Sequence, residues 1–125
     1  MTLVQRAQSA YAKAATPVRS QRSVEYDAFS KISHTLRDAA LDRDRNFPAF
    51  AAALADNRRL WTTLAVDVAQ SENALPEDLR ARIFWLAEFA EAETREILRG
   101  AGDARVLIEI NAAIMQGLRG NEVPA

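Results

Sequence analysis

The pattern of apolar positions along the chain predicts helices and no strands. Apolar residues recur at intervals of three and four positions over long stretches, and the strict alternation of a half-buried strand is missing. One apolar stripe lies between residues 24 and 40, and another lies between residues 50 and 68. Alanine, leucine, arginine and glutamate, all good helix formers, dominate these stretches. The expected fold class is therefore all-α.

Two helices are expected in the first third of the chain. A short helix should cover about residues 3–14, with apolar residues along one side: Val4, Ala7, Tyr11 and Ala14. Thr16 and Pro17 have the residue types of an N-cap and a first helical position, so a second helix should begin there and run to about Leu41. Its apolar residues form one stripe: Val24, Ala28, Phe29, Ile32, Leu36, Ala39 and Ala40.

The third helix should begin at Pro48, after the polar segment 42–46. Residues 71–73 should close it, with Asn73 able to adopt a left-handed conformation. One side of this helix is apolar apart from an asparagine, and it is expected to be buried: Phe50, Ala53, Leu54, Asn57, Leu60, Trp61, Leu64 and Val68.

The fourth helix should begin at Pro76 and end at Gly100 and Gly102, and Asp103 should cap a fifth helix. The stripe of the fourth helix is Leu79, Ile83, Leu86, Ala87, Ala90, Ile97 and Leu98, and that of the fifth is Val106, Leu107, Ile110, Ile114 and Leu118. Residues 1–119 should form one domain, followed by a frayed tail at 120–125. Short loops favour a small antiparallel helical bundle of four main helices plus the short N-terminal helix.

Composition and charge exclude several classes of function. The 125-residue chain has no cysteine and a formal net charge of −1. Disulfides, thiolate catalysis and zinc–thiolate sites are therefore excluded, and no excess charge attracts nucleic acid or anionic lipid. The first residues lack the regions of a signal peptide, and no run reaches 18 apolar residues. We expect a cytoplasmic protein with no membrane partner.

Candidate catalytic and ligand-binding residues are sparse. The single histidine, His34, cannot supply the two Glu-x-x-His motifs of a di-iron bundle. Glu91 can pair with Arg95, and the acids of the fourth helix are spread around it: Glu88, Glu91, Glu93 and Glu96. No phosphate-binding loop and no nucleophile elbow is present. We expect no enzymatic activity, no cofactor and no metal.

Two patches of side chains are candidate binding sites. Arginines at 58–59 and at 80 and 82 have acidic residues close by, which makes direct RNA binding unfavourable. The fourth helix carries Phe84, Trp85 and Phe89 outside its main stripe, and Trp85 and Phe89 are four residues apart on a second side. A helix that is apolar on two sides is either central in its bundle or in contact with a partner. These three aromatic residues are the candidate partner-binding site, with Trp85 as its expected hot spot.

Two blocks of the sequence resemble the FlaF family of flagellar proteins. Residues 57–80 match its central pattern at nine positions: Asn57, Leu60, Trp61, Asp67, Asn73, Leu75, Pro76, Leu79 and Arg80. Residues 107–118 match its C-terminal pattern, including Ile110, Asn111 and Met115. Trp61 is expected to anchor the core, and Arg80 is expected to pair with Asp67 across a turn. Each of these residues serves either the fold or the binding site.

The resemblance implies an all-helical cytoplasmic protein that is needed to make bacterial flagella. FlaF proteins are linked to the production and export of flagellin, and they act with FlbT, which represses flagellin translation. The first hypothesis is therefore an interaction protein that binds flagellin, whose terminal segments are helical, and supports its secretion and synthesis control. The alternative hypothesis is a post-transcriptional regulator that acts on flagellin mRNA with FlbT, directly or indirectly.

Overall fold

The computed structural model describes residues 21–122, and it describes side chains for residues 26–117. It contains four helices: α2 (Gln21–Leu41), α3 (Phe47–Val68), α4 (Glu77–Leu98) and α5 (Ala104–Glu122). No strand occurs in this range, so the all-α prediction and its four main helices are confirmed. The expected helix at residues 3–14 and the expected start of the second helix at Thr16 and Pro17 lie outside the described residues. Helix α5 continues to Glu122, beyond the expected domain end at residue 119.

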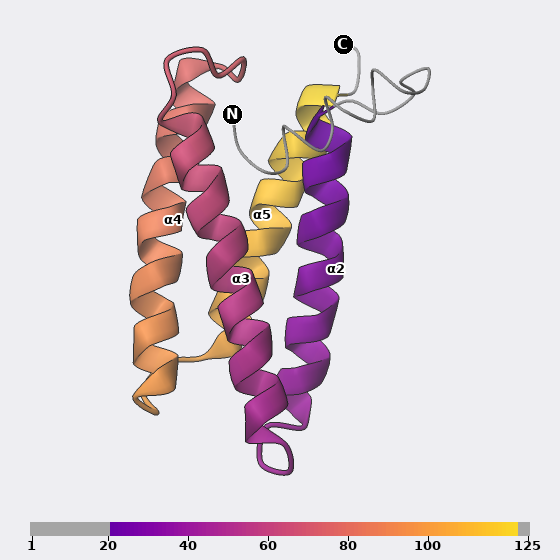
Figure 1. Ribbon diagram of the computed structural model, residues 1–125. Coiled ribbons are helices and arrows are strands. Elements are labelled where there is room, and N and C mark those ends of the chain that lie inside the picture. Colours follow the sequence, from indigo (N-terminus) through magenta and orange to yellow (C-terminus); the bar gives the residue numbers. More distant parts are fainter. Residues whose placement is uncertain (1–20, 123–125) are drawn as a thin grey trace.

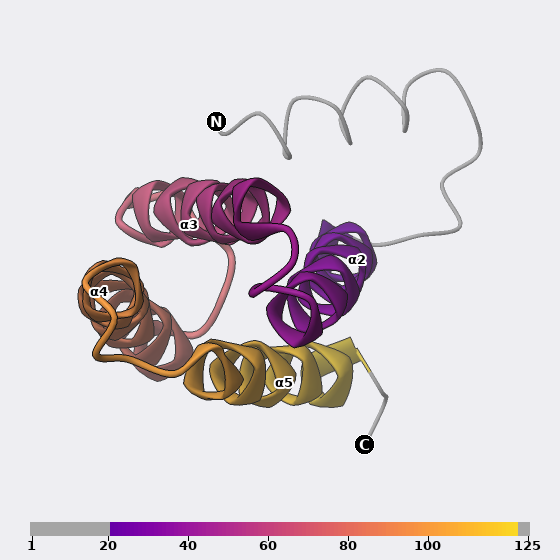
Figure 2. The same ribbon diagram turned by 90° about the horizontal axis from the view of Figure 1, so that it is seen from below.

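The four helices form an antiparallel bundle in which the chain direction alternates from each helix to the next (Figure 1). Helix α3 packs between α2 and α4, and α5 returns to pack on both α2 and α4 (Figure 2). The first and last described helices are thus direct neighbours. Because every helix has two main neighbours in this closed arrangement, none of the four is central.

The core is built from the apolar stripes that the sequence predicts. Its largest buried apolar side chains come from all four helices: Phe29 and Leu36 of α2, Phe50, Leu54 and Trp61 of α3, Ile83 of α4 and Leu107 of α5. The ring of Phe29 meets the ring of Trp61 edge to face, with centroids 5.2 Å apart. One stripe residue was predicted wrongly: Leu98 is 49% exposed, because it lies on the last turn of α4 beside the groove described below.

A buried hydrogen-bond network links three of the helices, and Asn111 of α5 is its centre. The Asn111 Nδ2 group donates to Asn57 Oδ1 of α3 at 2.7 Å and to Ser33 Oγ of α2 at 2.9 Å. Its Oδ1 atom accepts from Trp61 Nε1 at 2.7 Å. Asn57 and Asn111 are completely buried, and Asn57 Nδ2 has no hydrogen-bond partner among the described residues. Helix α4 contributes nothing to this network.

The turn between α3 and α4 is closed by two side chains that bind backbone carbonyls at the end of α3. Asn73 Nδ2 donates to the Asp67 carbonyl at 3.2 Å, and Asn73 Oδ1 accepts from the Leu75 amide at 3.0 Å. Arg80 donates through Nε to the Val68 carbonyl at 3.0 Å and through Nη2 to the Gln70 carbonyl at 2.6 Å. These bonds satisfy carbonyls that a helix end leaves without partners.

The expected left-handed conformation of Asn73 is wrong, because no non-glycine residue in the described range has a positive φ. Asn73 acts through its side chain, which forms an Asx turn with the Leu75 amide. The other residues at the ends of α3 and the start of α4 act as the sequence predicts. Asn46 caps α3 by accepting from the Ala49 amide at 3.2 Å, with Pro48 in the first turn. Pro76 directly precedes α4, as expected.

Helix α4 ends in a Schellman motif around Gly100, whose φ is +88°. The Gly100 amide donates to the Ile97 carbonyl at 3.0 Å, and the Ala101 amide donates to the Glu96 carbonyl at 2.8 Å. Asp103 then caps α5, because its Oδ1 atom accepts from the Arg105 amide at 2.9 Å. Both ends were predicted from the residue types at these positions.

Replacing Asn111 by leucine should destabilise the bundle strongly. The Asn111→Leu change keeps the branched shape of the side chain, although leucine is larger, and it removes the acceptor of the Trp61 indole and the donor to Asn57. Each buried polar group that loses its partner costs about 1–3 kcal/mol, so the free energy of unfolding should fall by about 3 kcal/mol or more in urea denaturation. The exposed neighbour Ala112→Leu is the control, and its effect should stay within about 0.5 kcal/mol. Equal stabilities for the two variants would contradict the role of the network.

Alanine substitutions at two glycines should change stability in opposite directions. Gly100→Ala places a Cβ in a left-handed conformation and should lower the free energy of unfolding by about 1–2 kcal/mol. Gly117→Ala lies within α5, where an added Cβ meets nothing within 4 Å. It should raise the free energy of unfolding by about 0.5–1 kcal/mol, because glycine loses more entropy than alanine in a helix. Thermal and urea denaturation measure the change in the free energy of unfolding for each variant. Changes in the same direction would contradict the different roles of Gly100 and Gly117.

Candidate functional site

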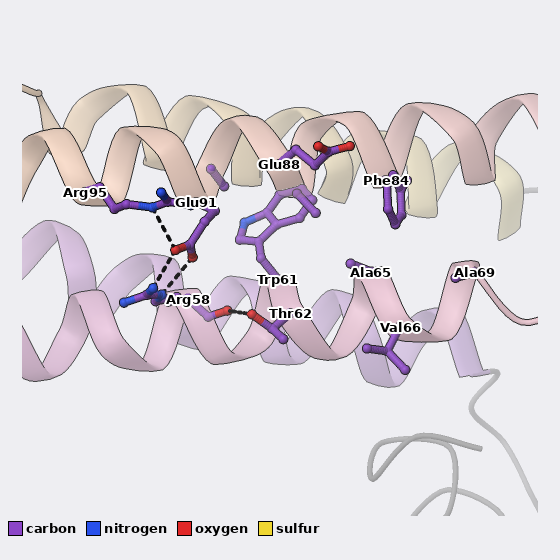
Figure 3. A pocket seen from close by; sticks show the side chains of 12 residues that line it. Arg58, Trp61, Thr62, Ala65, Val66, Ala69, Phe84, Glu88, Glu91 and Arg95 are labelled. Carbon is purple, nitrogen blue, oxygen red and sulfur yellow. Dashed lines mark hydrogen bonds and ion pairs between the residues drawn. The ribbon is translucent and has the colours of Figure 1, made fainter.

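An open apolar groove of about 490 Å³ lies between α3 and α4, on the outside of the bundle (Figure 3). Small side chains keep it open: Ala65 from α3, Ala69 directly after α3, and Ala87 and Ala90 from α4. Val66 and Phe84 line it and remain 52% and 43% exposed. Large apolar side chains in this position would be expected to be covered, so this surface resembles a binding groove more than a closed helix interface.

A second hollow of about 370 Å³ continues this groove toward the other end of the two helices. The two hollows share Arg58 and Thr62 in their linings, and the second adds Leu54 and the exposed Leu98. Together their linings run from Ala51 of α3 to Ala69, the C-cap of this helix, which corresponds to about 27 Å at 1.5 Å per residue. We call this combined surface the α3–α4 groove.

An ion-pair bridge crosses the α3–α4 groove near its middle. Arg58 of α3 donates to both carboxylate oxygens of Glu91 on α4, through Nε at 2.7 Å and through Nη2, and Arg95 Nε donates to Glu91 Oε2 at 3.2 Å (Figure 3). Burial alone would raise the pKa of Glu91, but the hydrogen bonds and charge of Arg58, and then of Arg95, outweigh it and hold the pKa below its ordinary value. The predicted pairing of Glu91 with Arg95 is confirmed.

The three aromatic residues of the predicted partner-binding site fall on two different sides of α4. Phe84 lines the α3–α4 groove, whereas Trp85 and Phe89 do not. Trp85 and Phe89 instead stack on each other, with ring centroids 5.8 Å apart and an angle of 27° between their planes. All three are exposed among the described residues, with Trp85 at 62%. A central position of α4 therefore does not explain them, and their role in binding stays a prediction.

The signature residues of the two matched blocks serve the fold in most cases. Asn57, Trp61 and Asn111 form the buried network, and Asn73 and Arg80 close the α3–α4 turn. Leu60 and Asp67 are buried, while a further group is partly buried against the core: Leu75, Leu79, Ile110 and Met115. Pro76 is the exposed residue that precedes α4.

Trp61 is the one signature residue that belongs to both the core and the groove. Its indole nitrogen binds Asn111 inside the bundle, and its ring lines the α3–α4 groove from within (Figure 3). The sequence did not reveal the groove itself, because the alanines that create it have the same spacing as ordinary core positions. Ser33, the fourth member of the network, was also missed, although it lies four residues after Phe29 and three before Leu36 and so falls on the buried side of α2.

In the described part of the chain, no group of three or more histidine, cysteine or acidic residues is arranged to hold a metal ion. Between residues 21 and 122, no helix combines the length and apolar character needed to cross a membrane.

The fold and the groove define the class of the protein: a small antiparallel helical bundle with an apolar groove along two of its helices. Comparison with protein families then identifies the family. The model of the family described as flagellar protein FlaF matches residues 7–118, and the chain belongs to the FlaF family. The chain is therefore a flagellar protein. Neither the curated proteins nor the solved structures include a match.

The ion-pair bridge should make stability depend on pH in a defined direction. Because the pKa of Glu91 is lower in the folded protein than its ordinary value of 4.5, the bridge stabilises the fold at neutral pH and loses this effect as the pH falls through the folded pKa. The difference in melting temperature between the natural chain and Glu91→Gln should thus be largest at pH 7 and shrink as the pH falls below 4.5. A Glu72→Gln control should show no such change, and a constant difference for Glu91→Gln would contradict the assignment.

Proposed function

We propose that this protein binds flagellin before export, by holding one helical segment of flagellin in the α3–α4 groove. Membership of the FlaF family makes it a flagellar protein, and the groove gives it a surface on which a helix fits. The observation that carries the proposal is the row of exposed apolar side chains along this groove: Val66, Phe84 and Leu98.

The dimensions of the groove suit a single amphipathic helix. A length of about 27 Å accommodates about 18 helical residues, which is five turns. Helices that dock in grooves place apolar anchors at positions i, i+3, i+4 and i+7, so that one face is buried. An unassembled flagellin subunit exposes terminal helical segments that await partners in the filament. Covering one apolar face of such a segment would prevent its premature association.

The alternative, a regulator that contacts flagellin mRNA directly or with FlbT, has less support. RNA binding requires arginine side chains that are available for phosphates. Several exposed arginines are engaged with carboxylates of the same chain: Arg58 and Arg95 with Glu91, Arg59 with Asp56, Arg99 with Glu96, and Arg105 with Asp103. Control of flagellin synthesis can also follow indirectly from flagellin binding, since bound flagellin changes the free pool that other regulators sense.

The test is a calorimetric titration of the purified protein with flagellin monomer in moderate salt. Saturable binding with a negative heat-capacity change is expected, because apolar surface is buried. Phe84→Ala should weaken binding by about tenfold, which corresponds to about 1.4 kcal/mol. Trp85→Ala, at the adjacent position of α4, separates this proposal from the hot spot expected from the sequence. Because Trp85 lies outside the groove, binding in the groove predicts a change in affinity of less than about twofold.

Three other outcomes would redirect the proposal. An equal loss in Trp85→Ala would extend the binding surface to the second side of α4, where Trp85 and Phe89 stack. No binding by folded protein would make FlbT or RNA the immediate partner. A complex with RNA would be recognised by its steep weakening with salt, which a hydrophobic groove does not show.

A further inference from the structure

Charged side chains divide the α3–α4 groove into an acidic part and a basic part. Glu88 lines the groove between Phe84 and the ion-pair bridge, and it forms no salt bridge with any residue in the described range (Figure 3). The bridge joins two arginines, Arg58 and Arg95, to the one carboxylate of Glu91. Two positive charges and one negative charge give the bridge a formal charge of +1, and both arginines remain exposed to solvent. The groove therefore presents a negative and a positive group side by side.

The side of α4 that faces the groove has these groups at heptad spacing. Five lining residues follow one another at alternating intervals of four and three positions, which places them along one side of the helix: Phe84, Glu88, Glu91, Arg95 and Leu98. The two apolar ends, Phe84 and Leu98, are about 21 Å apart along the helix, and Glu88 and Arg95 are about 10 Å apart. The order along the groove is thus apolar, acidic, basic and apolar.

A helix that binds in the groove has to match this order. Its apolar anchors would contact Phe84 at one end and Leu98 at the other. Between the anchors, a lysine or arginine is favoured beside Glu88, because a charge that loses water at an apolar surface needs an opposite charge nearby. An acidic residue is favoured beside Arg95, which donates to Glu91 through Nε and has further N–H groups to donate.

We infer that the α3–α4 groove selects a helix that carries one basic and one acidic residue about seven positions apart, between two apolar anchors. The basic residue pairs with Glu88, and the acidic residue pairs with Arg95. The order of the two charges sets the direction in which the helix lies, because the opposite direction would bring like charges together. The inference rests on the proposed function, since the occupant is the flagellin helix proposed above. Recognition of the charge pattern can nevertheless be measured without flagellin.

A solvated carboxylate with no part in recognition is the competing explanation for Glu88. Such a group would act on a charged helix only through the general field of the protein, and this effect depends on the net charge of the helix. Recognition by Glu88 depends instead on where the charges lie on the bound helix. Two helices of identical composition and different charge placement therefore distinguish the two explanations.

The test uses two synthetic helical peptides of about 18 residues, which is the length that the groove accommodates. Both peptides have the same apolar seam at heptad spacing and the same numbers of lysines and glutamates. In the flank peptide, lysines border the seam on both flanks in one half, and glutamates border it in the other half. In the back peptide, the same lysines and glutamates lie on the opposite side of the helix. Fluorescence anisotropy of the labelled peptides measures their affinities for the full-length protein in moderate salt.

The flank peptide should bind about fivefold more tightly than the back peptide, which is the upper range for exposed ion pairs. This preference should shrink in about 1 M salt, where the screening length falls to about 3 Å. Glu88→Gln should reduce the preference to about twofold, because one of the two ion pairs is lost. The control Glu77→Gln, which changes an acid of the first turn of α4 outside the groove lining, should leave the preference unchanged. Circular dichroism verifies that each variant is folded.

Equal affinities for the two peptides would overturn the inference, and so would a preference that Glu88→Gln leaves unchanged. The absence of saturable binding by either peptide would overturn it too, because the groove would then not hold a helix of this spacing. A protein that binds the flank peptide but does not bind flagellin monomer would contradict the proposed function alone. Failure of the charge pattern is thus distinct from failure of flagellin binding.

Discussion

The arrangement of the bundle depends on the hydrogen bonds of one buried side chain, that of Asn111. Apolar packing alone would tolerate small shifts of one helix along another, since methyl groups fit many neighbours. The Asn111 amide tolerates no such shift, because it must meet Asn57, Trp61 and Ser33 at once. A displacement of one turn in any of the three helices would leave several buried polar groups without partners. The network therefore fixes the register of α2, α3 and α5, and it leaves α4 to be positioned by other means.

Helix α4 is held by features that also create the candidate site. Its contact with α3 uses small alanines, the ion-pair bridge of Glu91 and the turn closed by Asn73 and Arg80. Close packing of small residues brings the helix backbones together and leaves a hollow above them. Trp61 connects the two systems, since the hydrogen bond that orients its indole in the core also sets the position of its ring under the groove. The buried hydrogen-bond network and the α3–α4 groove therefore share a side chain, that of Trp61, and depend on each other.

The sequence predicted the helices well because their ends are marked locally. Pro48, Pro76, Gly100 and Asp103 each stand where the structure begins or ends a helix, and the 3.6-residue period identifies the buried faces. Leu98 was misplaced because periodicity does not show where a neighbouring helix stops covering the stripe.

The candidate site was less predictable than the helices. Its aromatic residues were found, but their division between two sides of α4 and the alanine-lined groove depend on how α3 and α4 pack, which no local pattern encodes. The resemblance singled out Asn57 and Asn111, yet their pairing across 54 positions also required the fold.

The network also determines when during synthesis the bundle can be completed. Ser33 and Asn57 precede their partner Asn111 by 78 and 54 positions. At about 5–20 residues per second, a ribosome needs about 3–11 s to travel from Asn57 to Asn111. Helices form within about a microsecond, so α3 can be helical for seconds while the Trp61 indole still lacks its acceptor. The nascent chain therefore cannot hold its native register, or present a finished groove, until translation has passed through α5.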